Sequence, residues 1–398
     1  MINMDMIREA HEVVKAAGAV YTPVLHAPKV AENVYIKCEN LQKTGSFKLR
    51  GAAYKISKFT DAEKAAGVIA CSAGNHAQGV ALSATSQGVK SIICMPASAP
   101  LAKVEATRGY GAEVVLVPGV YDDAYAKALE LQKEHGYTFA HPYNDDYVMA
   151  GQGTIGLEIL EQLPDVDCVI VPIGGGGIAA GISYAIKQLK PECTVIGVQA
   201  DEASAMVNSI RNGVLGTTET CNTIADGCAV KAPGDKTFEV CKQYLDDVVT
   251  VSEEAIAIAM LTLLERNKVS AEGAGAMPTA AVMSGKVDVS KFKNVVCMVS
   301  GGNVDVSMQT KLITKALTAT GRITEICTEV SDKAGNLVKL LELVSSNGAN
   351  ILEVNHIRNT TDVAITSCVV RLTVETRDQA HKDELYALLA ENGYKHIR

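Results

Sequence analysis

The run Lys43-Thr44-Gly45-Ser46-Phe47-Lys48-Leu49-Arg50-Gly51 contains Lys48, the residue of this chain best placed to do covalent chemistry. A Val-, Tyr- and Ile-rich stretch at 33–39 predicts a strand before it, and residues 49–58 predict a helix after it. Lys48 is therefore expected near the start of a helix, behind a flexible Gly-Ser turn. A lysine held there can form a Schiff base with an aldehyde cofactor. A single lysine is more often a solvated surface residue, so the other motifs must decide.

Four consecutive glycines, Gly174, Gly175, Gly176 and Gly177, stand between a predicted strand at 168–173 and a predicted helix. The backbone N–H groups of such a loop can surround an anion, and the helix N-terminus adds a favourable dipole. The loop lacks the Lys-Ser/Thr ending of a P-loop, which disfavours a nucleoside triphosphate. A tight turn is the plainer interpretation, but four adjacent glycines cost backbone entropy that packing alone seldom requires. We therefore predict a phosphate-binding loop.

A polar turn, Ser72-Ala73-Gly74-Asn75-His76, follows the predicted strand 68–71 and precedes a helix. In open α/β sheets, ligands bind at the carboxyl ends of the strands, where this turn is expected. Ser72 and Asn75 can hydrogen-bond a ligand, and the backbone N–H groups can hold a carboxylate. Asn75 can equally be an ordinary helix cap, and a lone histidine such as His76 is more often structural.

Two further glycine-containing runs complete the candidate turns. Ser300-Gly301-Gly302-Asn303 follows an apolar strand at 295–299, and Ser300 can hydrogen-bond a ring nitrogen. Gly151-Gln152-Gly153-Thr154 is predicted to open a helix that runs to Gln162. Each is also compatible with a plain turn or helix start. A Schiff-base lysine, a phosphate loop, a carboxylate-binding turn and a ring-nitrogen partner together favour one cofactor, pyridoxal phosphate.

The composition predicts a globular α/β protein. The chain has 398 residues, of which 47% are hydrophobic and 21% charged, and it contains no tryptophan. The core must be built from Ala, Val, Ile and Leu, which suits parallel strands. The net charge is −8 and no basic stripe is present, so we expect neither nucleic acid nor membrane as a partner. No apolar run approaches the roughly 18–20 residues that span a bilayer.

The cysteines and the N-terminus predict a cytoplasmic protein. The 11 cysteines are scattered without a C-x-x-C pair, which fits a reducing compartment. Residues 1–12 contain Asp5, Arg8 and Glu9, a mixture of charges that is not expected in a signal or transit peptide. Cys221 and Cys228 have no histidine nearby, so we expect no metal site there.

Short apolar runs alternate with helical stretches through most of the chain. The predicted strands are 68–71, 91–95, 113–117, 168–173, 194–199 and 295–299, and the helices after them begin near residues 75, 101, 122, 177, 203 and 304. This alternation predicts an α/β fold with parallel sheets covered by helices.

The pattern changes near residue 321. The expected order is a strand (322–330), a helix (337–346), two strands (350–357 and 363–374) joined by a polar turn (358–362), a helix (378–391) and a short strand (394–397). This is the βαββαβ pattern of the ferredoxin-like unit. We therefore expect a catalytic domain at 1–320, with a small subdomain at roughly 54–150, and a second domain at 321–398.

The motifs resemble those of the threonine/serine dehydratase family of fold-type II pyridoxal-phosphate enzymes. The residues that carry the resemblance, in the order found in the family, are Gly45–Ala52, Ser72–His76, Gly174–Gly177, Thr223–Gly227 and Ser300–Asn303. The resemblance covers about residues 5–317, and the joint pattern is highly specific. The C-terminal segment looks more loosely like an ACT domain, a fold that binds amino-acid effectors.

The resemblance implies a role in cofactor binding for several residues. Lys48 would hold the cofactor and shuttle the proton, and Phe47 would pack beside the ring. Asn75 would bond the 3′-oxygen, and Ser300 would face the pyridine nitrogen. Gly174–Gly177 would hold the phosphate.

The resemblance also implies residues around the substrate. The substrate carboxylate would lie near Ser72, Ala73 and His76, together with the same asparagine. Gly227 and Glu272 would line the cofactor pocket.

The implied reaction is β-elimination of L-threonine, and of L-serine, to 2-oxobutanoate or pyruvate plus ammonia. Related serine racemases carry a second serine where this chain has Ala73, so racemisation is disfavoured. Their divalent-cation ligands correspond here to Gln199, Ala203 and Ala205, so no metal is carried over. A racemase or β-replacement synthase of the same fold is the alternative enzyme. A non-catalytic amino-acid sensor is the alternative of another class.

The ACT-like domain implies regulation by an amino acid such as isoleucine or valine. Its candidate effector site is the loop with Asp332, Gly335, Asn336 and Leu337, or else a domain interface. A purely structural dimerisation unit is the alternative. We expect a homodimer or homotetramer that acts in threonine catabolism or isoleucine biosynthesis.

Overall fold

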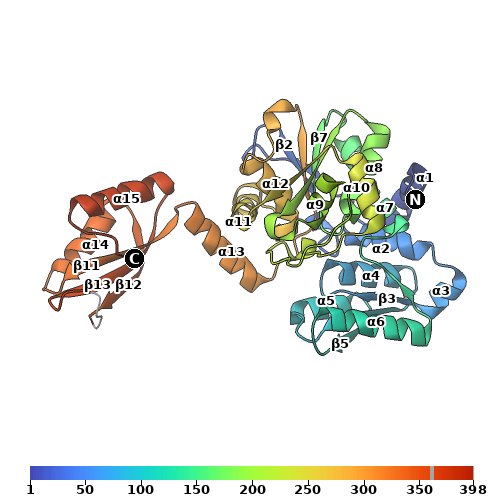
Figure 1. Ribbon diagram of the computed structural model, residues 1–398, viewed down its shortest axis with the longest axis horizontal. Coiled ribbons are helices and arrows are strands. Elements are labelled where there is room, and N and C mark those ends of the chain that lie inside the picture. Colours follow the sequence, from blue (N-terminus) through green and yellow to red (C-terminus); the bar gives the residue numbers. More distant parts are fainter. Residues whose placement is uncertain (359–362, 398) are drawn as a thin grey trace. The chain divides into compact units, whose positions relative to one another are not determined.

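The structure is a computed structural model that describes residues 1–358 and 363–397 (Figure 1). The chain divides into two compact units, Met1–Asp305 and Val306–Arg398. The boundary expected near residue 320 falls at the end of helix α13 (Val306–Ala319), which is grouped with the second unit. Among the described residues, no helix combines the length and the apolar character needed to cross a membrane.

The first unit contains a six-stranded sheet in the order β1-β2-β10-β7-β8-β9. Its strands are β1 (Val24–His26), β2 (Val34–Cys38), β7 (Cys168–Pro172), β8 (Thr194–Ala200), β9 (Asp247–Val251) and β10 (Val295–Val299). All neighbours pair in parallel except β1 and β2 at one edge. Strands β7 and β10 are buried along their whole length, which explains their continuous apolar sequences.

A second, four-stranded sheet of the first unit has the order β5-β4-β3-β6 and is parallel throughout. Its strands are β3 (Val68–Cys71), β4 (Ser91–Pro96), β5 (Glu113–Val117) and β6 (Thr138–Phe139). Helices α4 and α6 lie on opposite faces of this sheet (Figure 1). The predicted α/β class with parallel sheets in two subdomains is confirmed.

Helices connect the strands, in the alternation that the sequence predicts. They are α1 (Met4–Ala16), α2 (Lys48–Ser57), α3 (Asp61–Ala66), α4 (Asn75–Ser86), α5 (Leu101–Gly109), α6 (Tyr121–His135), α7 (Asp146–Gln162), α8 (Gly177–Leu189), α9 (Ala205–Asn212), α10 (Asp235–Tyr244), α11 (Glu253–Thr262) and α12 (Gly273–Met283). Helices α1, α3, α10, α11 and α12 were not predicted. The sequence of α12 is almost wholly apolar and contains Pro278, so this helix has neither a polar face nor a favourable local propensity.

Helix α7 begins earlier than predicted, and the expectation that Gly151–Thr154 opens it is wrong. Asp145 caps the helix, because its side chain accepts hydrogen bonds from two backbone N–H groups of the first turn. Gly151 lies inside the helix, where an added Cβ would be 2.6 Å from the carbonyl oxygen of Arg50. The glycine therefore permits α7 to pack closely against α2 and does not form a turn.

The second unit contains a three-stranded antiparallel sheet in the order β11-β13-β12. After α13, its elements are β11 (Ile323–Ser331), α14 (Asn336–Ser346), β12 (Asn350–Ile357), β13 (Ser367–Glu375) and α15 (Gln379–Glu391). An isolated antiparallel bridge joins Thr328 to His396, so the last segment lies beside β11. The spatial order, fourth-first-third-second, is that of the predicted ferredoxin-like unit.

Two details of the second unit differ from the prediction. Strand β13 begins at Ser367 instead of 363, because residues 363–366 form a turn that leads into it. The last strand, expected at 394–397, is reduced to the single bridge at His396. Most of the predicted turn 358–362 lies outside the described residues.

Four buried charges tie α2 to its neighbours in the first unit. Arg50 Nη2 lies 2.7 Å from Glu39 Oε1, and Arg50 Nη1 lies 2.6 Å from Glu158 Oε1. Lys37 Nζ lies 2.6 Å from the other carboxylate oxygen of Glu158. These side chains are at most 3% exposed, and two carboxylates balance two cations. The network holds the helix that carries Lys48 against β2 and α7.

Replacing Arg50 with alanine is expected to lower the free energy of unfolding by about 3–5 kcal/mol. The reason is that Glu39 and Glu158 would stay buried after losing their cation. Urea unfolding followed by circular dichroism measures the change. The control is Arg108→Ala, which removes an exposed ion pair with Glu105 and should cost no more than about 1 kcal/mol. Equal losses for the two variants would contradict the prediction.

Candidate active site

Lys48 is the first residue of α2, and its amine is held inside the first unit. Its Nζ donates a hydrogen bond to the carbonyl oxygen of Pro142 at 2.9 Å and lies 5.2 Å from the centre of the Phe47 ring. Burial lowers the pKa of Lys48 to about 8. Part of the amine is therefore neutral near physiological pH, and the neutral amine is the form that attacks a carbonyl.

The turn before Lys48 is joined to the end of β10. The backbone N–H of Phe47 donates to the carbonyl oxygen of Ser300 at 3.1 Å, and Ser46 forms an isolated bridge with Gly301. Phe47 and Ser300 are both buried. The structure thus brings the predicted Schiff-base lysine and the predicted ring-nitrogen partner to the same end of the larger sheet.

The turn from Ser72 to His76 joins β3 to α4, and its side chains reach the larger sheet. Ser72 Oγ accepts a hydrogen bond from a backbone N–H of the turn at 3.1 Å. Asn75 Nδ2 donates to Glu272 Oε1 at 2.7 Å, and Asn75 Oδ1 accepts from Asn303 Nδ2 at 2.8 Å. These bonds connect the turn to the start of α12 and to the loop after β10.

The other two candidate residues of this turn are His76 and Ala73. His76 is buried, and its Nε2 lies 2.8 Å from the carbonyl oxygen of Ala140. Burial and the nearby charge of Lys48 lower the pKa of His76 to about 3, so the imidazole is neutral at physiological pH. This geometry favours the structural interpretation of His76. Ala73 is half-buried and offers no group that could transfer a proton.

The four glycines form the turn between β7 and α8, and all are buried. Gly176 caps the helix with φ of +97°, a backbone conformation that favours glycine. A Cβ on Gly175 would lie 2.4 Å from the ring of Tyr143, and one on Gly177 would lie 2.9 Å from Tyr143 Cβ. Side chains are excluded from this turn, and the free N–H groups of the first turn of α8 can bind an anion.

Gly227 and Glu272 lie beside these elements. Gly227 belongs to the short 3-10 turn Asp226–Cys228, and a Cβ on Gly174 would be 3.2 Å from its carbonyl oxygen. Glu272 directly precedes α12 and is 4% exposed. Burial raises the pKa of Glu272 to about 7, and the charge of Glu272 acts on Lys48. A proton-accepting group thus lies close to the amine.

Three residues of this site were assigned no role in it from the sequence. Asn303 donates to both Asn75 and the carbonyl oxygen of Thr44, and it closes the predicted Ser300 run. Cys228 is buried near Lys48, and burial raises its pKa to about 12, so it remains a neutral thiol. Tyr143 packs against the glycine loop and donates to the carbonyl oxygen of Ala232. No local pattern in the sequence could have indicated Tyr143.

The four predicted effector residues lie in the second unit, in and after the loop between β11 and α14. Gly335 has φ of +90° and caps α14, which begins at Asn336. Asn336 Nδ2 donates to a carbonyl oxygen at the end of β11, and Asp332 pairs with Arg358 at 3.1 Å. Leu337 packs against the core of the unit. These contacts fix the conformation of the loop within the second unit.

Comparison with known proteins agrees with this geometry. A family model described as pyridoxal-phosphate dependent enzyme matches residues 16–301. The chain belongs to this family. A curated relative, the L-threonine ammonia-lyase of Thermotoga maritima, is 48% identical over 399 residues, which cover 99% of each protein.

Two solved structures of the family are similar to this one. Threonine deaminase isoform 2 from Solanum lycopersicum has a TM-score of 0.73 and 35% identity over 79% of this chain and 94% of its own. Maize serine racemase has a TM-score of 0.74 and 34% identity over 80% of this chain and 98% of its own.

The cofactor of the family is pyridoxal phosphate, and the site fits it. The glycine turn has no room for side chains and stands at a helix N-terminus, as a phosphate group requires. The amine of Lys48 has a lowered pKa, as a Schiff-base lysine requires. The buried hydroxyl of Ser46 has no hydrogen-bond partner among the described residues, so it can accept one from a ligand.

The raised pKa of Glu272 predicts a pH-dependent stability of the cofactor-free protein. The folded state holds this proton up to about pH 7, and the unfolded state loses it near the ordinary pKa of a glutamate, 4.5. Folding therefore loses stability as the pH rises from 4.5 to 7, because the folding chain must then take up a proton that the unfolded chain has already released. Glu272→Gln, which can still accept the bond from Asn75, should equal the wild type at pH 5. At pH 8 it should be more stable by roughly 1–3 kcal/mol.

Urea unfolding at the two pH values measures this difference. Glu105→Gln on α5 is the control, because Glu105 is exposed. A difference between Glu272→Gln and the wild type that does not change with pH would show that Glu272 is ionised in the folded protein throughout.

Proposed function

We propose that the chain is an L-threonine ammonia-lyase that also accepts L-serine and forms 2-oxobutanoate or pyruvate plus ammonia. The observation that carries the proposal is the amine of Lys48, which has a pKa of about 8, bonds to the carbonyl oxygen of Pro142 and follows a turn that is bridged to the loop after β10. Similarity over 99% of the chain to a curated L-threonine ammonia-lyase supports threonine as the substrate.

In this proposal, the cofactor is held by residues of both sheets. Lys48 would bond covalently to it, Phe47 would pack beside its ring, and Asn75 would donate to its 3′-oxygen. Ser300 would face the pyridine nitrogen, and Gly174–Gly177 would bind the phosphate. Two further residues, Gly227 and Glu272, would line this pocket.

The substrate carboxylate is proposed to bind at the turn with Ser72, Ala73 and His76. Ser72 and Asn75 contribute hydrogen bonds, together with the backbone N–H groups at the start of α4. Neutral His76 stabilises the helix by its bond to the Ala140 carbonyl oxygen. For Lys48 to act as the base, the α-hydrogen of the bound substrate must point toward its amine.

The proposed reaction depends on proton transfer by Lys48. When bound, pyridoxal phosphate supplies an electron-withdrawing ring conjugated with the substrate α-carbon. Lys48 Nζ takes the α-proton, the β-hydroxyl leaves with the electrons of the C–O bond, and it takes up one proton to become water, so that the substrate loses one α-hydrogen and one hydroxyl in total. The unsaturated amine that is released hydrolyses to the 2-oxo acid and ammonia. A pKa near 8 suits this task because the free amine is then both available and basic.

A serine racemase of the same fold is the alternative, supported by the similarity to the maize enzyme. Racemisation needs a second acid or base on the face opposite Lys48. The resemblance assigns this role to the position of Ala73, which has no such group. Chiral analysis of serine after incubation, beside 2-oxo acid analysis, distinguishes racemisation from elimination.

The Lys48→Ala variant, reconstituted with pyridoxal phosphate, is expected to lose the absorbance band near the edge of the visible range that arises from the cofactor-bound lysine. Its production of 2-oxobutanoate from threonine should fall by at least about 100-fold, because both the attachment point and the base are removed. Lys43→Ala, in the same run but exposed, should keep both properties. A wild-type protein that stays colourless with the cofactor would refute the proposal.

The second unit is proposed to regulate the enzyme as an ACT-like domain. Isoleucine or valine would bind at the loop with Asp332, Gly335, Asn336 and Leu337, which stands between a strand end and a helix start. An effector of this kind must bind two states of the enzyme with different affinities.

We further propose a cytoplasmic homodimer or homotetramer. The cysteines support a cytoplasmic location of the protein, because all 11 are free thiols.

A chain that ends at residue 320 should keep its 2-oxobutanoate production, because the family match ends at residue 301. It should lose any response to isoleucine or valine. Initial rates at several threonine concentrations, with and without each amino acid, measure both properties. The same response in the truncated and full-length enzymes would place the effector site in the first unit.

A further inference from the structure

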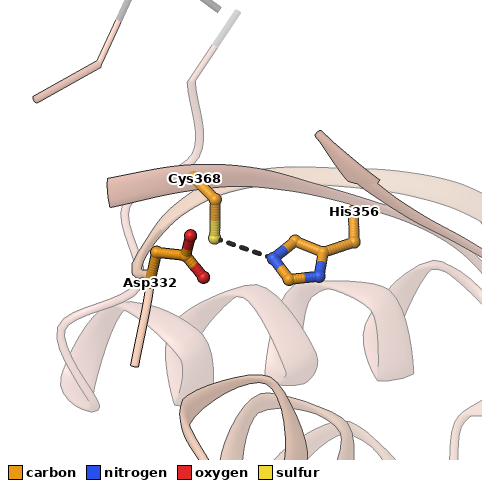
Figure 2. A group of neighbouring side chains, drawn as sticks. All are labelled: Asp332, His356 and Cys368. Atoms are coloured by element: carbon orange, nitrogen blue, oxygen red, sulfur yellow. Dashed lines mark hydrogen bonds between the residues drawn. The ribbon is translucent and has the colours of Figure 1, made fainter. Parts of the chain in front are cut away.

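Three side chains of types that can ligate a metal ion lie together at one corner of the sheet of the second unit. They are those of Asp332, in the loop after β11, His356 on β12 and Cys368 on β13. Figure 2 shows the imidazole and the carboxylate on either side of the Cys368 sulfur. None of the three has a role in the proposed lyase chemistry.

The register of the sheet explains why these residues meet. His356 pairs with Val370 on β13, so Cys368 is its diagonal neighbour on the same face. Cys368 also pairs with Val330 on β11, and Asp332 follows just beyond the end of that strand. The arrangement is therefore set by the backbone of three segments and not by one mobile side chain.

The distances are close to those of a tetrahedral zinc site. One ligand atom of each residue lies within 4.8 Å of the other two, and His356 Nε2 is 3.1 Å from Cys368 Sγ. Zinc bonds of about 2.0–2.3 Å place the ligand atoms roughly 3–4 Å apart. A small inward movement of the Asp332 carboxylate is sufficient to complete three ligands. Sulfur, imidazole nitrogen and one carboxylate oxygen suit zinc better than a hard, oxygen-preferring cation.

The present partners of these atoms can be replaced by a metal. The Cys368 thiol donates a hydrogen bond to the carbonyl oxygen of Val330 at 3.2 Å. Arg358 Nε contacts both oxygens of Asp332, at 3.1 and 3.2 Å. The Arg358 side chain is 63% exposed, and exposed ion pairs of this kind contribute little stability. Asp332 can therefore exchange its guanidinium partner for a divalent cation.

A reactive cysteine–histidine pair is the other chemistry that these residue types allow. A nucleophilic cysteine needs a lowered pKa and access to solvent. Here the side chain of Cys368 is 1% exposed, and burial raises its pKa. Metal coordination does not need a free thiolate beforehand, because the metal itself displaces the thiol proton.

We propose that Asp332, His356 and Cys368 bind one zinc ion, with the fourth position open to water. The Cys368 thiol proton is released to solvent as the Zn–S bond forms, and no electron is transferred. Asp332 and His356 are exposed, so the ion can enter from the surface. Bound zinc would link the loop before α14 to β12 and β13 and would stabilise this corner of the sheet.

The test uses the full-length holoenzyme in buffer without amino acids. Zinc binding is measured by calorimetry in two buffers of different ionisation enthalpy, which also gives the protons released per ion. Cobalt(II) titration, read as a difference spectrum, reports the thiolate-to-metal band. The variants are His356→Gln, whose exposed side chain is not needed for folding, together with Cys368→Ser and Asp332→Asn. The controls are Cys327→Ser and His396→Gln at the opposite edge of the sheet.

The wild type and both controls should bind one zinc ion with release of a proton, and cobalt should give a thiolate band. Each of the three ligand variants should bind this ion at least about tenfold more weakly. Cys368→Ser should also lose the cobalt–thiolate band, while keeping its lyase rate. The proposal is overturned if His356→Gln and Cys368→Ser bind zinc as tightly as the wild type. It is equally overturned if the control variants lose zinc to the same extent.

Discussion

The first unit depends on one buried ionic network. Arg50 pairs with Glu39 and Glu158, and Lys37 also pairs with Glu158. Four charges with almost no access to water persist only because each carboxylate has a cation at hydrogen-bonding distance. The network joins α2 to the nearby end of β2 and to Glu158 on α7, which is 108 residues from Arg50 in the sequence, and it sets the position of α2. Since Lys48 is the first residue of that helix, the network also determines where its amine lies.

Around Lys48, a second set of contacts joins the two sheets of the unit. Asn75 comes from the smaller sheet, and it bonds Glu272 and Asn303, which follow elements of the larger one. Burial changes the proton affinity of both ionisable groups here, lowering that of Lys48 and raising that of Glu272. Each of the two groups is therefore partly neutral near physiological pH. The N-terminus of α8 can then bind the negatively charged phosphate of the cofactor.

Much of the fold was predictable because local sequence and tertiary structure agree. The strands β3, β5 and β10 have the predicted bounds, since each is a short apolar run between turn residues. Among the helices that were not predicted, α12 has no periodic pattern, because it is buried and made largely of small apolar residues. The start of α7 was misplaced for a related reason. Glycine inside a helix looks like a turn unless the neighbouring helix that it must accommodate is known.

The sequence by itself determined the family, the cofactor and the motifs that carry the chemistry, because glycine runs and polar turns at strand ends are local patterns. Only the tertiary structure decided which side chains meet. Asn303 and Tyr143 acquired a role through contacts across the first unit. His356 and Cys368 lie on different strands, so only the register of the sheet brings them within reach of each other. The shifted pKa values likewise follow from burial, a property that the folded chain creates and that no single segment contains.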